Sequence, residues 1–151
     1  MISEQTTQKS RVQILRDEVK IRVATGEGAG AMIAEILAEN GIELPGVDWS
    51  VPFPNWLIAT VDMEVIGCCQ IAISKPIGYG EFLYVKKSVP FKLRAIAIRK
   101  LIIQAMATLH VAGCTYVGGF VSVENFKFNG VLERLGFVKA YTADLIMKRV
   151  A

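Results

Sequence analysis

The sequence is poor in the residues that build metal centres and disulfide frameworks. It has one histidine and three cysteines, and no two cysteines stand in a Cys-x-x-Cys spacing. A zinc site usually takes four Cys, His or carboxylate ligands, and a disulfide framework needs paired cysteines. We therefore expect no metal site, and three reduced thiols in a cytoplasmic protein. Cys68 and Cys69 point to opposite faces of a predicted strand, which indicates that one is in the core and the other on the sheet surface.

Long apolar runs and a strong net charge are also lacking. Lys, Arg or Gln interrupts every apolar stretch well before the ~18 residues that a membrane span needs. The region up to Lys20 is polar and shows no secretory signal. A net charge of +3 suits a small anionic ligand and does not demand nucleic acid. We expect neither a membrane nor a nucleic-acid partner.

What the sequence does contain is typical of a globular domain. Apolar residues make up 52% of its 151 residues and charged residues 21%, which excludes a disordered chain. Residues 1–17 are polar and predict an N-terminal arm, suited to docking on a second copy or a larger assembly. Residues 18–151 predict a single domain, with no internal repeat.

Hydrophobic periodicity predicts alternating strands and helices with one long loop. The long predicted helix joins two strands, and such a crossover should make them parallel neighbours or near neighbours, while the other strands are expected to be antiparallel. The loop at residues 42–55 is rich in proline and aromatic residues. The predicted strands are 19–24, 56–61, 65–74, 81–87, 116–122, 137–140 and 144–150, the predicted helices are 31–40, 91–110 and a short one after Asn125, and a turn is expected at 74–80.

One segment near the C-terminus carries a recognisable pattern. A strand from Tyr116 is followed by Asn125 at the mouth of a short helix, and Gly136 with Phe137 suits a helix that ends in a left-handed residue. This segment resembles the acceptor-side motif of the GNAT superfamily of acyl-CoA-dependent N-acyltransferases. The resemblance implies an α/β fold of the α+β type, in which a mixed, mostly antiparallel sheet with a splayed parallel pair is flanked by helices.

The resemblance also implies a site for acetyl-CoA or another acyl-CoA. The backbone of Leu83 and Val85 would hold the pantetheine arm together with Asn125, and the loop at Lys87 with the start of the long helix would hold the pyrophosphate. The residues aligned with the phosphate motif of the family are Lys92, Leu93, Arg94, Ala95, Ile96 and Ala97, where Ala95 replaces a glycine. Two alternatives stay open: an amphipathic helix with ordinary surface cations, and an Asn125 that only caps its helix.

The resemblance implies direct attack of an amine on the thioester. Glu81 would act as the base, unless it is only a carboxylate at an exposed strand end, and the Val85 N–H would polarise the carbonyl. Leu132 stands where the family usually has the Tyr that protonates the thiolate, so water would supply that proton. The acceptor would be an amine-bearing small molecule, a protein N-terminus or a lysine, held under the 42–55 loop. Trp49 and its aromatic neighbours would line that pocket or merely pack the loop.

Two functions from different classes follow from these observations. The first is an N-acetyltransferase in the cytoplasm. The second keeps the fold without the chemistry, because short-tailed phages carry GNAT-like virion proteins and both Ala95 and Leu132 depart from the family pattern. An unrelated α/β binding module is a third alternative.

Overall fold

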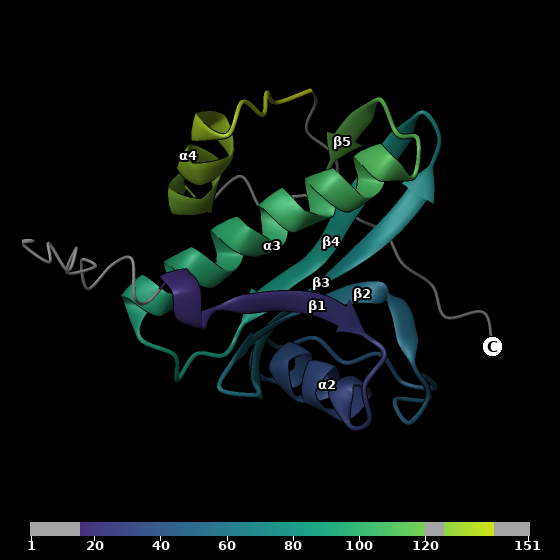
Figure 1. Ribbon diagram of the computed structural model, residues 1–151, viewed down its shortest axis with the longest axis vertical. Coiled ribbons are helices and arrows are strands. Elements are labelled where there is room, and N and C mark those ends of the chain that lie inside the picture. The colour runs from purple at the N-terminus through teal and green to yellow at the C-terminus, as the bar shows by residue number, and fades with distance from the viewer. Residues whose placement is uncertain (1–15, 120–125, 141–151) are drawn as a thin grey trace, which may run out of the picture.

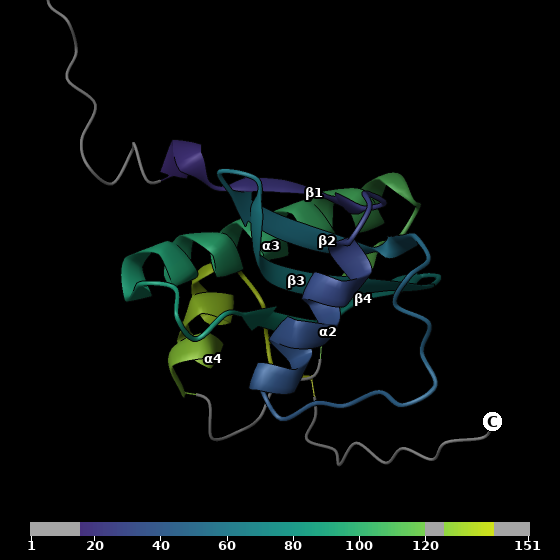
Figure 2. The same cartoon turned by 90° about the horizontal axis from the view of Figure 1, so that it is seen from below.

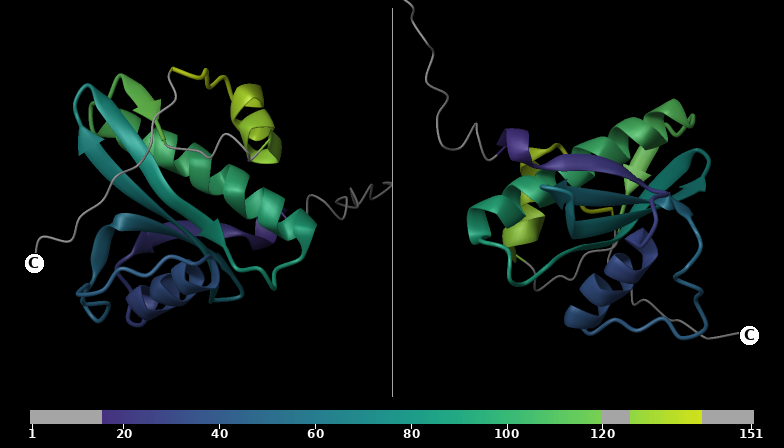
Figure 3. Two further views of the ribbon diagram at one scale, coloured as in Figure 1. Left: turned by 180° about the vertical axis from the view of Figure 1, so that it is seen from behind. Right: turned by 60° about the horizontal axis from the view of Figure 1, so that its bottom comes forward.

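The computed structural model describes residues 16–119 and 126–140, and these form a five-stranded sheet with helices on both faces (Figure 1). Helix α2 covers one face of the sheet and α3 crosses the other (Figure 2). Helix α4 lies near the N-terminal half of α3 (Figure 3). The elements are β1 (Lys20–Ala24), α2 (Ala29–Glu39), β2 (Phe53–Val61), β3 (Glu64–Ser74), β4 (Ile77–Val85), α3 (Phe91–Val111), β5 (Tyr116–Gly118) and α4 (Phe126–Arg134).

The strands lie in the order β1-β2-β3-β4-β5. The first four pair antiparallel with their neighbours, and β5 pairs parallel with β4 after the α3 crossover. The predicted mixed sheet with one parallel pair is therefore confirmed. Asp62 and Met63, with φ of 48° and 71°, form the tight turn between β2 and β3 that the sequence predicted.

The prediction was wrong about the segment after β3. A turn was expected at 74–80, but β4 already begins at Ile77, and Gly78 lies within it. The reason is close packing: a Cβ on Gly78 would lie 2.5 Å from Cδ2 of Leu109 in α3. The glycine thus serves contact between helix and sheet, whereas the sequence pattern alone suggested a turn.

Other boundaries differ by smaller amounts. Residues 137–140 are described without strand structure, so the strand predicted there is wrong. Within the long helix, Gln104 is exposed and donates to the Thr108 hydroxyl at 3.2 Å. Residues 1–15 of the arm predicted at 1–17, Asn125 and the strand predicted at 144–150 lie outside the described residues.

The core consists of two apolar clusters, one on each face of the sheet. Leu101 and Leu109 of α3 pack with strand residues on one face, and Ile33 and Leu37 of α2 pack with strand residues on the other. Because both faces are covered, consecutive residues of β2 and β3 are buried.

The adjacent thiols show this two-sided burial. Cys68 belongs to the α2 cluster and Cys69 to the α3 cluster, and both are almost fully buried. The prediction that they face opposite sides is confirmed. The expectation that one lies on the surface is wrong, because a helix covers each side.

Replacing Gly78 by alanine should destabilise the fold through overpacking against Leu109. Leu109 is itself fully buried and cannot swing away, so we expect a loss of about 1–3 kcal/mol of unfolding free energy, measured by urea denaturation. Gly26→Ala is the matched control, since a Cβ there meets only Arg22 at 3.9 Å. A Gly78→Ala/Leu109→Ala variant should cost less than the sum of its parts. Additive costs would show that this contact is not the cause.

Candidate functional site

The described residues of β5 pair in parallel with the first part of β4. The pairs are Ile77 with Tyr116, Gly78 with Val117 and Tyr79 with Gly118. Gly119 still lies close, since a Cβ on it would be 2.8 Å from the Gly80 carbonyl oxygen. Beyond that point β4 continues to Val85, and no described residue of β5 pairs with it.

A β-bulge interrupts β4 where the pairing with β5 has stopped. Gln70 of β3 lies opposite Glu81, but Cys68 lies opposite Tyr84, so β4 has one residue more than β3 in this interval. Phe82 takes up the extra residue with φ of 49°. A bulge bends its strand and increases the local twist, which turns the end of β4 relative to its neighbour.

The register fixes the direction in which the Val85 amide points. The Lys86 N–H donates to the Ile66 carbonyl at 2.8 Å, so it points toward β3. Successive amides of an extended strand point to opposite edges, so the Val85 N–H points away from β3. It therefore faces the edge of β4 that the described part of β5 leaves unpaired.

Helix α3 presents its N-terminus next to this edge. It begins at Phe91 after Pro90, and no side chain caps it. The Arg94 N–H donates to the Pro90 carbonyl at 2.9 Å, so the amides of Phe91, Lys92 and Leu93 precede the first bond within the helix. Such amides, together with the positive end of the helix dipole, favour an anion.

The cations around this helix end are of two kinds. Lys86 is buried and its ammonium lies 3.4 Å from the Glu64 carboxylate. Lys87 and Lys92 are exposed and Arg94 is half-buried, and within the described ranges none of these three has a carboxylate within 4.0 Å. One anionic group is nevertheless present, because the Glu39 carboxylate of α2 accepts the Lys87 backbone N–H at 3.1 Å.

The other residues of the predicted phosphate motif differ in environment. Ala95 is exposed on α3. Leu93 and Ile96 pack partly against the core, and Ala97 is fully buried in it. Leu83, whose backbone was predicted to hold the pantetheine arm, also packs its side chain against that core cluster. Roles for these residues stay predictions.

Helix α4 ends as the sequence predicted. The Phe137 N–H donates to the Leu132 carbonyl and the Gly136 N–H to the Glu133 carbonyl, both at 3.0 Å, and Gly136 has φ of 88°. This is a Schellman cap. Leu132, at the position of the missing phenol, is half-buried within this helix.

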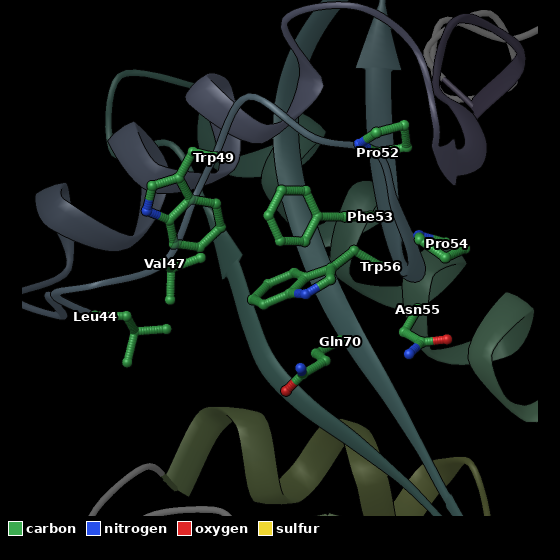
Figure 4. A pocket seen from close by; sticks show the side chains of 9 residues that line it. All are labelled: Leu44, Val47, Trp49, Pro52, Phe53, Pro54, Asn55, Trp56 and Gln70. Atoms are coloured by element: carbon green, nitrogen blue, oxygen red, sulfur yellow. The ribbon is translucent and has the colours of Figure 1, made fainter. Parts of the chain in front are cut away.

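A hollow of about 270 Å³ lies under the loop between α2 and β2, on the face of the sheet opposite α3 (Figure 4). Three aromatic rings gather in it. The ring centroids of Trp49 and Phe53 are 5.1 Å apart, and those of Trp49 and Trp56 are 6.3 Å apart in an edge-on contact. The residues that line it are Leu44, Val47, Trp49, Pro52, Phe53, Pro54, Asn55, Trp56 and Gln70. The predicted loop aromatics thus do both things that were considered: they pack the loop and they line a hollow.

The loop reaches this position because α2 has no side chain in its way. A Cβ on Gly30 would lie 2.1 Å from the Trp49 carbonyl oxygen and 2.9 Å from the Phe53 ring. The helix was predicted to begin at residue 31, whereas the structure has Gly30 buried in the first turn of α2.

A row of cross-strand partners connects the hollow with the predicted base. Trp56 lies opposite Gln70, and Gln70 lies opposite Glu81. Partners directly opposite each other share a face and have Cβ atoms about 4.5–5.5 Å apart. Phe82 stacks on Trp56 with centroids 5.9 Å apart. The sequence analysis missed Gln70 and Phe82, because only the strand register and the bulge bring them to Trp56.

The thiols do not supply a nucleophile to this site. Burial, together with the neighbouring Cys69, raises the pKa of Cys68 to about 12, and burial raises the pKa of Cys69 to about 12 as well. Burial also raises the pKa of the half-buried Tyr84 phenol. A thiol becomes a good nucleophile only as a thiolate, so these cysteines are core residues.

Two negative observations concern the described residues alone. Among residues 16–119 and 126–140 there is no group of three or more His, Cys, Asp or Glu side chains able to hold a metal ion. No helix within these ranges is both long and apolar enough to cross a membrane.

Several solved structures have a fold similar to that of this chain. A putative acetyltransferase from Agrobacterium tumefaciens str. C58 is similar with a TM-score of 0.66 at 16% identity, over 85% of this chain and 99% of that one. AAC(6')-Iy in complex with the bisubstrate analogue CoA-S-monomethyl-acetylneamine is similar with a TM-score of 0.63 at 18% sequence identity. The match covers 87% of this chain and 98% of that one. A transcriptional regulator from Bacillus halodurans C-125 is similar with a TM-score of 0.63 at 18% sequence identity. That match covers 87% of this chain and 99% of the regulator.

No family model matches the sequence, and no curated protein does. AAC(6')-Iy is an aminoglycoside N-acetyltransferase, and the sheet order, the parallel β4–β5 pair and the flanking helices agree with that fold. The chain has the GNAT fold, as the sequence predicted. At these identities the likeness shows the fold alone.

The buried thiols predict a pH dependence of stability. Because the folded pKa values are raised to about 12, the unfolded thiols ionise first, and stability falls as pH rises above about 8.5. From about pH 8 to about pH 9.5 we expect a loss of about 1 kcal/mol per thiol, measured by urea unfolding. A Cys68→Ala/Cys69→Ala variant should lose correspondingly less over the same interval, and equal losses in both proteins would contradict this assignment.

Proposed function

We propose that the protein is an N-acyltransferase that uses acetyl-CoA or another acyl-CoA and transfers the acyl group to an amine. The observation that carries the proposal is the end of β4, from Glu81 to Val85, with which no described residue of β5 pairs. There a bulge at Phe82, an outward Val85 amide and the uncapped N-terminus of α3 follow one another along the chain. The solved structures of the same fold include an N-acetyltransferase bound to a CoA-containing bisubstrate analogue.

The residues around the open edge fit the chemistry of a CoA thioester. The amides of Phe91, Lys92 and Leu93 and the dipole of α3 suit the pyrophosphate, and the side chains of Lys87, Lys92 and Arg94 add positive charge. These side chains compensate for Ala95, whose Cβ keeps phosphates further from the backbone than glycine would. When bound, acyl-CoA supplies an electrophilic thioester carbon.

The residues of the chain have distinct tasks in this proposal. The Val85 N–H donates a hydrogen bond to the carbonyl oxygen as negative charge develops on it. Glu81 takes the proton from the attacking nitrogen, directly or through a water molecule. Leu132 cannot donate a proton, so water protonates the departing thiolate, whose pKa of about 8.5 makes it a tolerable leaving group.

Removing a phosphate-site cation should weaken donor binding. For Lys92→Ala we expect the Kd for acetyl-CoA, measured by calorimetry, to rise about three- to tenfold, since a charge-assisted hydrogen bond is lost. The effect should shrink at high salt. Lys20→Ala on the distant edge strand β1 is the control, because Lys20 is equally exposed. An unchanged Kd in Lys92→Ala, or an equal rise in the control, would place the phosphates elsewhere.

Replacing the proposed base should affect turnover without affecting donor binding. In Glu81→Gln we expect kcat for acetyl transfer to fall about 10²- to 10⁴-fold, while the Kd for acetyl-CoA stays the same. Release of the CoA thiol, followed with a chromogenic thiol reagent, measures kcat. Glu133→Gln, an exposed carboxylate on α4, is the control. If kcat of Glu81→Gln stays within about threefold of the parent, Glu81 is not the base.

The alternative of a virion component without catalysis stays a prediction, because no structural observation favours it. It is distinguished by ligand binding. A protein that has kept only the fold should show no thermal stabilisation by acetyl-CoA even at a large excess.

A further inference from the structure

We propose that the acceptor is a primary amine that carries an aromatic or bulky apolar group, and that this group occupies the hollow at Trp49, Phe53 and Trp56. This inference rests on the proposed function and names the substrate class of the same site. The shared chemistry covers a free arylalkylamine and a peptide whose N-terminal residue is aromatic.

The lack of charged side chains among the described lining residues disfavours polycationic acceptors. Among the described residues, the lining of the hollow includes no Asp, Glu, Lys or Arg, and its side-chain amides are those of Asn55 and Gln70. Binding of an aminoglycoside or a polyamine would leave several ammonium groups without carboxylate partners, which costs free energy in an apolar site. An acceptor with one amine and an uncharged body fits these walls.

The size and the ring geometry point to a compact apolar body. The volume of about 270 Å³ lies just below the range of about 300–1,000 Å³ that is typical of drug-sized ligands. Three rings with centroids 5.1 and 6.3 Å apart provide stacking and edge-on contacts for one further ring. These dimensions suit one ring system on a short chain, rather than several linked sugars.

The cross-strand row gives the acceptor its direction. From Trp56 through Gln70 to Glu81 the same face of the sheet changes from aromatic to amide to carboxylate. An amine whose ring lies against Trp56 therefore extends its nitrogen past Gln70 toward Glu81. Trp56 at one end of the row thus selects the ring, and Glu81 at the other end removes the proton from the nitrogen.

The reaction balances with this orientation. The neutral amine nitrogen forms a bond to the acyl carbon and loses one proton, which Glu81 passes to solvent. The carbon–sulfur bond breaks with its electron pair on sulfur, and the thiolate takes a proton from water. The products are an N-acyl amide and free CoA.

The test uses the intrinsic fluorescence of the protein. The chain has two tryptophans, Trp49 and Trp56, and both line the hollow. The full-length protein is titrated with 2-phenylethylamine, a tripeptide with N-terminal phenylalanine, ethylamine, spermidine and kanamycin, without CoA. We expect saturable changes in emission with one or both of the aromatic amines. Tighter binding of the free amine or of the tripeptide identifies the natural source.

A matched pair of variants locates the binding. Phe53→Ala removes one ring of the hollow and should raise the Kd of 2-phenylethylamine about three- to tenfold. Ile103→Ala truncates an exposed apolar side chain on α3, on the other face of the sheet, and should leave it unchanged. Equal effects in the two variants would overturn the assignment to the hollow.

Turnover separates this inference from the proposed function. Acetylation of spermidine, kanamycin or ethylamine with a kcat/KM equal to or above that of the aromatic amines overturns the inference, although the protein is then an acyltransferase. Saturable fluorescence with the aromatic amines supports the inference about the hollow. If no amine is acetylated and acetyl-CoA does not stabilise the protein, the proposed function fails independently of that result.

Discussion

The bulge in β4 is the constraint on which the rest of this arrangement depends. One extra residue at Phe82 changes the register between Gln70 and Cys68, and it does so without breaking the sheet, because the pairing resumes at Tyr84. Upstream of the bulge β4 pairs with β5, and downstream its outer edge carries the Val85 amide. The bulge also turns Phe82 onto the α2 side, where it stacks on Trp56. A single irregularity therefore shapes the edge proposed for the acyl donor and also supports Trp56, which lines the hollow proposed for the acceptor.

The two sides of the sheet carry the residues proposed to bind different substrates. The α3 side provides a continuous apolar core and a helix end with positive charge, and the α2 side provides aromatic residues and a loop held close by Gly30. Strand β4 borders both sides, so the N-terminus of α3 and the aromatic residues of the α2 side both lie near this one strand. A fold with low sequence identity to its structural neighbours can thus keep this geometry, since backbone amides, a bulge and a helix N-terminus depend little on particular side chains.

Much of the fold follows from local patterns in the sequence. Periodicity located α2, α3 and the β2–β3 hairpin, and Gly136 marked the end of α4 as a left-handed residue. Gly78 was misassigned because a glycine in a turn and a glycine beneath a helix look alike until the partner, Leu109, is known. The row from Trp56 to Glu81 could not be predicted from the sequence either. Its register depends on the position of a bulge at Phe82, and phenylalanine rarely takes positive φ. Propensity describes single segments, whereas the site arises from how segments align.

The hydrogen bond between Glu39 and the Lys87 amide joins the end of α2 to the loop before α3. A backbone amide has one proton to donate, so an incoming phosphate oxygen and this carboxylate compete for it. Occupation of the loop by an anion would therefore remove this link between α2 and the loop, while the buried side chains of α2 stay packed on the sheet. The same helix contacts the aromatic loop at Gly30, so α2 meets the surroundings of both proposed substrates.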